Sequence, residues 1–310
     1  MTNIEQTIKD IKNIKIQGAD AISSACVTAI IDYAKILRKE PVEKFLKSLA
    51  EKSFALGSAR PTEPLARNSL FYLLESVEKQ LKVRKNSTTE ELIVELIMRA
   101  DRIEAKMKEV KEQIINHGAK LIAKKTKFLT HCHSTSAESI LLSGTQLMKK
   151  NRKVFTTETR PLYQGRKTVE DLAKGGLNPT LIIDSAAPFI LSGGFGKFVT
   201  PEVVLIGADA VLPDGSIINK VGSYGIALAA QKNHIPVYSV AGLLKYAEKD
   251  QIIELRNEAE IIFASPDFDV FNPAFDKVPA ELITGIICEA GIVKPRDFKA
   301  IAHKKYSWLK

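Results

Sequence analysis

The hydrophobic pattern of this chain changes its period near residue 118, and this change limits the folds that the sequence can adopt. Before that point, apolar residues recur with helical spacing, at alternating gaps of three and four between residues 93 and 114. After it, short apolar runs alternate with helical segments. A chain of 310 residues has room for two domains. The sequence therefore predicts a helical domain over residues 1–118 and an α/β domain over residues 119–310.

The first part of the chain is expected to be entirely helical. Helices are expected over residues 19–39, 41–56 and 64–82, with a longer one over most of residues 87–117. Ser87 and Glu90 have the spacing of a capping box, which favours a helix start at that point. Gly118 favours the end of the same helix.

The second part predicts a doubly wound parallel sheet, because short strands alternate with helical crossovers. Strands are expected at residues 127–131, 153–158, 180–185, 202–209, 236–241 and 260–265, and helices at 136–151, 168–176 and 224–234. Ligands of such sheets bind at the carboxyl ends of the strands, where the strand order reverses. The strand ends that we expect to carry function are Cys132, Glu158 to Arg160, Asp184, Asp209, Asn219 and Lys220.

Composition and charge indicate a cytoplasmic protein. Hydrophobic residues make up 45% and charged residues 26%, and no apolar run reaches the roughly 18 residues of a membrane span. Three widely spaced cysteines do not form a disulfide framework. The net charge of +9 would suit an acidic partner such as nucleic acid or a phosphorylated metabolite. Because the lysines alternate with glutamates, we expect a solvated basic surface, with no nucleic acid and no membrane as partners.

The stretch "LTHCHSTSAES", residues 129–139, places a cysteine between two histidines. If the strand continued through it, His131 and His133 would face one side and Cys132 the other. One metal ion could not then readily take both kinds of ligand, so we expect no metal site.

Helix capping gives the same stretch a second interpretation. Thr135 and Glu138 have capping-box spacing, which would place Cys132 just ahead of a helix N-terminus. Free amides and the helix dipole there favour a thiolate, and together with Ser134, Thr135 and Ser136 they would form a phosphate cradle. A small, buried, unreactive cysteine fits the position equally well.

A second group of polar residues follows the buried strand at residues 202–209. Asp209 comes where this strand meets the expected ligand crevice, and a partly desolvated carboxylate has a raised pKa that suits acid–base catalysis. Asn219 and Lys220 follow, and Lys220 could meet a phosphate as a point charge. Asp209 would serve equally well as a turn or helix-cap residue.

These segments resemble the superfamily that contains translation initiation factor 2B regulatory subunits and aldose-phosphate isomerases. The shared text is "THCHS", "TETRPLYQG", "IDSAA", "GADAVLPDGSIINKVGS" and "NPAFDKVPAELI", and "ARPTEPLARN" resembles the arginine-bearing turn of the superfamily. The resemblance implies a helical domain followed by a Rossmann-like domain. It also implies a homo-oligomer, at least a dimer.

The isomerase branches of this superfamily carry a catalytic cysteine in T-H-C and a catalytic aspartate in G-A-D, and here these are Cys132 and Asp209. Length and the "NPAFD" element most resemble archaeal ribose 1,5-bisphosphate isomerase, which makes ribulose 1,5-bisphosphate during AMP and nucleotide breakdown. The resemblance thus implies a metal-independent aldose-ketose isomerase, an intramolecular oxidoreductase without a cofactor. A nucleotide activator is a further expected partner.

The resemblance also implies a set of substrate contacts. The matched positions are Arg60, Ser134, Thr135, Ser136, Asn219, Lys220 and Lys245, together with the early phosphate-binding element at Gln17, Gly18, Ala19 and Asp20. In this last element the isomerases have R-G-A-G, whereas this chain has Gln17 in place of the arginine and adds the carboxylate of Asp20. The substrate is therefore either the bisphosphate or a singly phosphorylated or nucleotide-derived sugar.

Two functions follow from these residues. In the first, a protonated Asp209 opens the sugar ring, a Cys132 thiolate removes the proton from C2, and Asp209 helps to deliver a proton to C1. In the second, the chain is a non-catalytic regulatory subunit like those of initiation factor 2B, which binds a nucleotide or a sugar phosphate.

Overall fold

The computed structural model describes residues 3–148, 152–194, 196, 199–249, 253–262 and 267–309. The α-helices are α1 (Asn3–Lys12), α2 (Ala19–Ile36), α3 (Val42–Gly57), α4 (Pro64–Val83), α5 (Thr89–Ile122), α6 (Thr135–Met148), α7 (Gln164–Lys174), α8 (Ala187–Leu191), α9 (Ser223–Lys232) and α10 (Phe298–Lys305). The strands are β1 (Lys127–Thr130), β2 (Lys153–Thr157), β3 (Asn178–Ile182), β4 (Val203–Gly207), β5 (Ala210–Val211), β6 (Ile217–Lys220), β7 (Val237–Val240), β8 (Phe275–Val278), β9 (Gly285–Cys288) and β10 (Gly291–Val293). Short 3₁₀ turns lie at Asp184–Ala186, Leu243–Lys245, Glu258–Glu260, Ala280–Leu282 and Pro295–Asp297.

The chain divides into two compact units. The first contains Met1–Glu109, Leu244–Tyr246 and Ala302–Lys310, and the second contains Val110–Leu243 and Ala247–Ile301. The boundary expected at residue 118 lies inside α5, which continues to Ile122.

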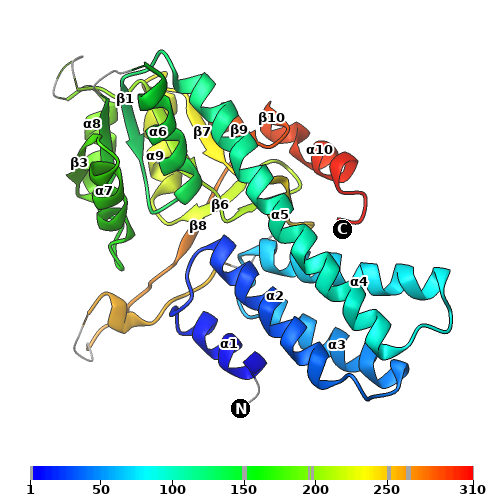
Figure 1. Cartoon of the computed structure of the whole chain (residues 1–310). Helices are drawn as coiled ribbons and strands as arrows, with labels where there is room; N and C mark the ends of the chain where they lie inside the picture. The colour runs from blue at the N-terminus through cyan, green and yellow to red at the C-terminus, as the bar shows by residue number, and fades with distance from the viewer. Residues whose placement is uncertain are drawn as a thin grey trace. The chain divides into compact units, whose positions relative to one another are not determined.

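The first unit is helical, as the periodicity predicts. Helices α2, α3 and α4 occupy the three expected segments and pack on one another (Figure 1). Each buries one apolar stripe: Ile22, Cys26 and Ile30 on α2, Leu49 and Leu56 on α3, and Leu70, Leu73 and Val77 on α4. Cys26 lies inside this core, where burial raises the pKa of its thiol to about 12, so it is a small apolar residue of the helix packing.

Both ends predicted for the long helix were wrong. The capping box is formed one residue later, since Thr88 Oγ1 accepts a bond from the amide of Glu91 at 3.3 Å and the Glu91 carboxylate accepts one from the amide of Thr88 at 2.7 Å. Gly118 does not end α5. A Cβ at this position would lie 2.4 Å from the side chain of Ile140 on α6, so glycine is needed there for close helix packing.

The second unit contains a seven-stranded sheet among the described residues, in the order β10-β9-β7-β4-β1-β2-β3. All its pairs are parallel except β9 with β10, which confirms the predicted α/β class. The strand predicted at residues 260–265 was wrong for residues 260–262, because residue 260 ends a 3₁₀ turn and 261–262 are irregular. Residues 263–265 lie outside the described residues. Strand β9, which is buried and was not predicted, pairs with β7 in parallel.

Helices pack against both faces of this sheet (Figure 1). On one face, the end of α5 packs with α6 and α7 over inward-facing residues of the strands. The members of this core include Ile114, Ile140, Leu172, Phe128, Val154, Val203 and Leu205. Because side chains alternate along β4, Val204 and Ile206 face the other side, where α9 packs on β4 and α8 packs on α9.

The strand order reverses between β1 and β4. The chain runs outward from β1 through β2 to β3, and then returns to place β4 on the opposite side of β1. In such sheets the loops that follow these two strands diverge and leave a crevice for ligands. Cys132 follows β1 and Asp209 follows β4, so the two residues flank the point where the sequence predicts a site.

A small antiparallel sheet, β5-β6-β8, follows Asp209 directly. The turn between β5 and β6 is tight, because Asp214 Oδ1 accepts a bond from the amide of Ser216 at 2.9 Å. In this sheet Asn219 pairs with Asp276 and Lys220 with Phe275.

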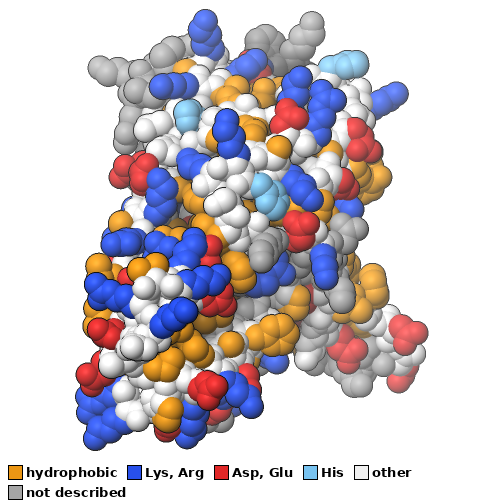
Figure 2. Space-filling model, turned by 90° about the vertical axis from the view of Figure 1, so that its right-hand side faces the viewer, with side chains coloured by type: hydrophobic (Ala, Val, Ile, Leu, Met, Phe, Trp, Pro, Cys, Tyr) orange, Lys and Arg blue, Asp and Glu red, His pale blue; other side chains and the backbone are white. Residues whose placement is uncertain are grey.

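Charged side chains of both signs are mixed on the face shown in Figure 2, with apolar groups between them. This distribution matches the alternation of lysine and glutamate in the sequence. Among the described residues, no helix is long and apolar enough to cross a membrane.

Candidate active site

Cys132 lies in a loop and not at the end of a strand. Strand β1 ends at Thr130, and Cys132 is half-buried with a left-handed φ of 65°. Two threonine side chains bind its backbone: its amide donates to Thr159 Oγ1 at 3.0 Å, and its carbonyl accepts from Thr168 Oγ1 at 3.0 Å. The loop after β2, through Thr159, and helix α7, through Thr168, therefore fix the conformation of this residue.

The two neighbouring histidines contact different elements, so the expectation that they face one side was wrong. Buried His131 lies 2.6 Å from Thr157 Oγ1 through Nδ1 and 2.9 Å from the Val221 carbonyl through Nε2. Burial lowers the pKa of His131, which favours a neutral ring. A neutral ring has one N–H, which Nε2 must donate to the carbonyl, so Nδ1 accepts from the threonine hydroxyl.

Ser134 caps helix α6, and the capping box predicted for Thr135 and Glu138 was wrong. The Ser134 hydroxyl accepts from the amide of Ala137 at 3.4 Å, and Thr135 is already the first helical residue. The carboxylate of Glu138 instead lies 2.6 Å from His133 Nδ1. Ser134 also approaches β4 closely, because a Cβ on Gly207 would lie 3.0 Å from its hydroxyl oxygen. Thr135 is exposed, and Ser136 is half-buried in the same first turn.

Asp209 and the Asn219–Lys220 pair lie on the small antiparallel sheet and its connection to β4. Asp209 is half-buried, and its amide donates to the carbonyl of Ile218 at 2.8 Å. Asn219 donates to Ser223 Oγ at 2.8 Å, at the start of α9. Lys220 is buried, with its ammonium 4.8 Å from the ring centroid of Phe275.

Neighbouring charged side chains shift the pKa of the Cys132 thiol. Burial raises the pKa of the Cys132 thiol to about 11; Lys220 lowers it, and the negative charges of Asp209 and Glu138 raise it further. The thiol is therefore protonated near neutral pH in the free protein, which favours the second of the two alternatives left by the sequence, a thiol that is unreactive in this state. The helix N-terminus does not overcome the desolvation of the sulfur.

The ends of β2 and β3 complete this edge of the sheet. The carboxylate of Asp184 accepts bonds from the amides of Thr159 at 2.8 Å and Arg160 at 2.7 Å. It therefore shapes the loop whose threonine holds the Cys132 amide. Gln164 begins α7 after this loop, and its buried Oε1 has no hydrogen-bond partner among the described residues. The sequence reading did not single out Gln164, because one glutamine in a loop carries no pattern.

The segment predicted to bind phosphate, residues 17–20, lies in the first unit at the start of α2. Gly18 is the N-cap with a left-handed φ of 85°, which suits glycine. Gln17 is exposed and donates to the carbonyl of Ile14 at 2.9 Å, Ala19 is buried, and Asp20 is exposed in the first helical turn. A carboxylate in a first turn stabilises the helix dipole, which gives Asp20 a structural role besides any effect on a ligand.

Arg60 and Lys245 also belong to the first unit. Arg60 forms a buried ion pair with Glu63 at 3.1 Å. Half-buried Lys245 ends a 3₁₀ turn whose neighbouring carbonyls, of Leu244 and Tyr246, accept bonds from Asn68 at 2.8 and 2.9 Å. Asn68 was not among the predicted site residues, although it ends the segment "ARPTEPLARN". The second unit holds the other predicted residues: Cys132, Ser134 to Ser136, Asp209, Asn219 and Lys220.

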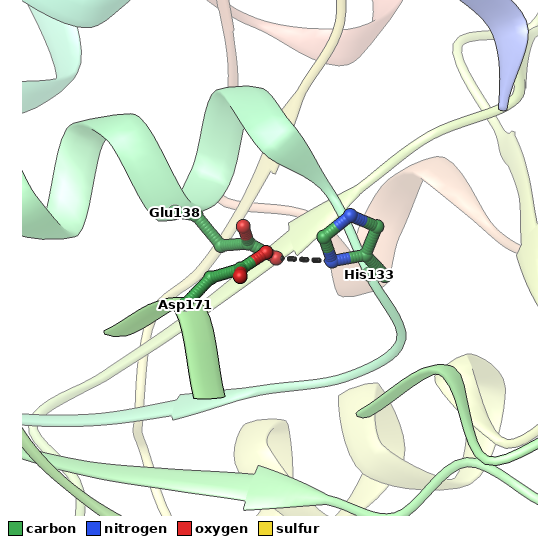
Figure 3. A group of neighbouring side chains, drawn as sticks. All are labelled: His133, Glu138 and Asp171. Atoms are coloured by element: carbon green, nitrogen blue, oxygen red, sulfur yellow. Dashed lines mark ion pairs between the residues drawn. The ribbon is translucent and has the colours of Figure 1, made fainter. Parts of the chain in front are cut away.

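His133, Glu138 and Asp171 form a cluster with potential metal ligands (Figure 3). Their ligand atoms lie within 4.8 Å of one another. However, His133 already bonds Glu138, and the ammonium of Lys167 lies 2.6 Å from the Asp171 carboxylate. The acidic groups are thus already compensated by basic ones, and the geometry is that of a hydrogen-bonded cluster. Asp171 lies on α7, and its distance along the sequence from His133 and Glu138 does not predict that it lies beside them.

Comparisons with known proteins match the whole architecture. Ribose 1,5-bisphosphate isomerase of Methanocaldococcus jannaschii is 32% identical, with 100% of this chain and 97% of that protein covered. Methylthioribose-1-phosphate isomerase of Carboxydothermus hydrogenoformans is 34% identical, with 94% and 87% covered. The crystal structure of translation initiation factor eIF-2B from Pyrococcus horikoshii superposes with a TM-score of 0.77 at 25% identity, covering 95% and 98%.

The order of the folded elements agrees with these relatives, with helices first and a mostly parallel sheet after them. The model of the family described as "Initiation factor 2 subunit family" matches residues 15–295, which is most of the chain. The protein therefore belongs to the initiation factor 2 subunit family.

Proposed function

We propose that this protein is a cytoplasmic sugar-phosphate isomerase that converts ribose 1,5-bisphosphate into ribulose 1,5-bisphosphate. The observation that carries the proposal is the pairing of Cys132 and Asp209 after two adjacent strands, with Lys220 acting on the same sulfur. The isomerase names of two relatives that align over nearly the whole chain support the reaction class.

The proposed reaction begins with the closed sugar ring, whose anomeric phosphate blocks the open-chain route. Asp209 gives a proton to the ring oxygen, and the bond between C1 and that oxygen breaks. The Cys132 thiolate then removes the proton from C2, and the bonding electrons form a C1–C2 double bond. Finally Asp209 takes the proton of the C2 hydroxyl while the thiol returns its proton to C1. The ketose forms and both groups regain their starting states.

The reactive form of the pair has its proton on Asp209 and a negative charge on sulfur. In the free protein the raised pKa of Cys132 favours the opposite arrangement, with the proton on sulfur. Protonation of Asp209 removes one of the charges that oppose the thiolate, while Lys220 continues to favour it. The pair therefore works by exchanging one proton, and a bell-shaped dependence of kcat/KM on pH is expected.

Two sugar phosphates are candidates for the substrate. The match to ribose 1,5-bisphosphate isomerase over the entire chain favours the bisphosphate. The exposed carboxylate of Asp20, at the position where the isomerases have the last glycine of R-G-A-G, would repel a second phosphate and so favours a sugar with a single phosphate. Methylthioribose 1-phosphate is the second candidate, because a relative named for it is 34% identical.

Direct turnover tests the proposal. The full-length protein is incubated with α-ribose 1,5-bisphosphate or methylthioribose 1-phosphate, with and without AMP, and the ketose is followed by NMR. Cys132→Ser and Asp209→Asn should each lower kcat by about 10²–10⁴-fold. Absence of turnover with both sugars would reject the isomerase. Binding of a nucleotide or sugar phosphate without turnover would then favour the non-catalytic regulatory protein.

We also propose that the second unit self-associates. Strand β3 is an edge of the sheet, and Leu181 on it, Ile183 just after it and Phe189 on α8 expose 42%, 60% and 48% of their surface. Leu228 on α9, which packs against α8, exposes a further 40%. Large apolar side chains grouped at a sheet edge favour contact with a second copy of the chain.

A further inference from the structure

A hydrogen-bonded network meets at the carbonyl of Cys132. Thr168 on α7 is 1% exposed, and its Oγ1 lies 3.0 Å from the Cys132 carbonyl oxygen, 2.8 Å from a Glu138 carboxylate oxygen and 3.1 Å from His133 Nδ1. His133 Nδ1 is itself 2.6 Å from the same carboxylate oxygen (Figure 3). Two side chains and one backbone carbonyl thus surround a single hydroxyl.

The number of protons decides how this network is bonded. The Thr168 hydroxyl has one proton, and a carboxylate attracts it more strongly than a neutral carbonyl does. His133 Nδ1 must carry a hydrogen, because two acceptors 2.6 Å apart would repel each other. The N–H of His133 on the same oxygen weakens the attraction of the carboxylate for the hydroxyl proton, so Thr168 can also donate to the Cys132 carbonyl.

The bond to the carbonyl matters because Cys132 has an unfavourable backbone conformation. A residue with a Cβ pays free energy to adopt a φ of 65°, and such residues persist only where their surroundings hold them. Here Thr159 holds the amide and Thr168 the carbonyl, and no other hydrogen bond to this backbone is seen within the described parts of the chain. Loss of the second bond would let the peptide rotate and the sulfur move.

We propose that Thr168, Glu138 and His133 are positioning residues that hold Cys132 so that its sulfur can exchange a proton with substrate. This inference deepens the isomerase function proposed above and rests on it for the role of the sulfur. His133 acts here as a fixed N–H donor that leaves the Thr168 proton for the cysteine. The charged and titratable groups that face it are Glu138 from α6, and Asp171 with its partner Lys167 from α7.

Two substitutions of Thr168 separate the hydroxyl from the shape of the side chain. Thr168→Val keeps the volume and removes the hydroxyl, and it should lower kcat roughly 10–100-fold with little change in KM. Thr168→Ser keeps the hydroxyl and should restore kcat to within about threefold of the original. Thr156→Val is the matched control, because Thr156 is buried on β2 and its Oγ1 has no partner among the described residues.

Alkylation of Cys132 measures the anchor without any turnover. Iodoacetamide labelling is followed by peptide mass spectrometry, with buried Cys26 and Cys288 as internal references. In Thr168→Val the thiol is expected to leave its desolvated position, so its pKa falls from about 11 toward the ordinary 9.0. Labelling of Cys132 near pH 8 should then rise by up to about 100-fold. Thr168→Ser and Thr156→Val should label like the original protein.

The outcomes distinguish the two proposals. No turnover by the unchanged protein would reject the isomerase, while faster labelling in Thr168→Val alone would still support the anchor. Unchanged kcat and unchanged labelling in Thr168→Val would overturn the anchor and leave the isomerase standing. If Thr168→Val does not fold, half-exposed His133 gives a second pair: His133→Leu should behave as described for Thr168→Val, whereas His133→Asn keeps an N–H near Nδ1 and should not. Equal behaviour of these two variants would also overturn the proposal.

Discussion

Replacing Asp276 with asparagine is expected to stabilise the folded protein above about pH 6. Asp276 Oδ2 accepts bonds from the amides of Gly222 at 2.8 Å and Tyr224 at 3.1 Å, at the start of α9. Its buried Oδ1 has no partner among the described residues. The two amides lower the pKa of this carboxyl, but burial raises it more, from 3.8 to about 6.

The sign of the effect follows from this difference. Because the folded-state pKa lies above the unfolded value of 3.8, the folded protein favours the protonated carboxyl. The resulting stabilisation is fully present below the unfolded pKa and is lost as the pH rises through about 6. The loss amounts to about 3 kcal/mol. Asparagine is uncharged and its oxygen can accept both amides, so Asp276→Asn should gain about 1–3 kcal/mol near pH 8, less where its NH₂ lacks a partner.

Urea unfolding at several pH values measures this prediction. The difference in unfolding free energy between Asp276→Asn and the original protein should be near zero around pH 4 and should grow through pH 6. Asp214→Asn is a control of opposite sign, since the amide of Ser216 and the ammonium of Lys277 lower the pKa of Asp214 despite its partial burial. That variant should be less stable near pH 8. Lower stability of Asp276→Asn near pH 8 would show that the helix amides outweigh burial, and would refute the reasoning.

Four further substitutions test the packing and the proposed self-association. Gly165→Ala would place a Cβ 1.7 Å from the carbonyl oxygen of Thr157 and should lower the unfolding free energy in urea by more than about 3 kcal/mol. In Gly225→Ala on α9 the new Cβ meets no atom within 4 Å, and the variant should gain about 0.5–1 kcal/mol. Equal effects of the two variants would contradict the close approach at Gly165. Arg152→Met should cost about 1–3 kcal/mol, because the buried guanidinium donates to the carbonyls of Ile122, at the end of α5, and Leu141, inside α6; a loss below about 1 kcal/mol would argue against that role. Phe189→Glu should shift the protein to monomer in light scattering, and an unchanged oligomer would exclude this edge as the interface.

Much of the fold could be predicted because periodicity reports burial. A continuous apolar run predicts the fully buried strand β4, and apolar residues at helical spacing predict the amphipathic helices of the first unit. The strand predicted at 260–265 failed because a short apolar run has the same composition whether or not it joins a sheet. Strand β9 was missed for the same reason, since its four buried residues form only a short apolar run. The role of Gly118 was also hidden, because a glycine that admits Ile140 and a glycine that ends a helix look alike in sequence.

The site could be predicted in part. The placement of Cys132 after β1 and Asp209 after β4 could be predicted, because strand ends of a doubly wound sheet meet at one edge; their catalytic role stays a prediction. The protonation state of Cys132 could not be found, because it depends on burial and on charges brought there by other loops. Thr168 carries no signal of its own: its position depends on how α7 packs beside α6, and only the folded chain brings its hydroxyl to Cys132.

The course of the chain through the helical unit limits how this protein can be divided. After leaving that unit in α5, the chain returns to it at Leu244–Tyr246 and again at its end, where Trp308 lies 5.1 Å from Tyr72 between ring centroids. A fragment ending near residue 118 would lose both returning segments and expose Tyr72 and the amide of Asn68. The helical unit is thus not a module that can be exchanged between relatives by a single crossover. Segments of the two units alternate along the sequence. Changes in one unit are therefore inherited together with the segments of the other unit that lie between them.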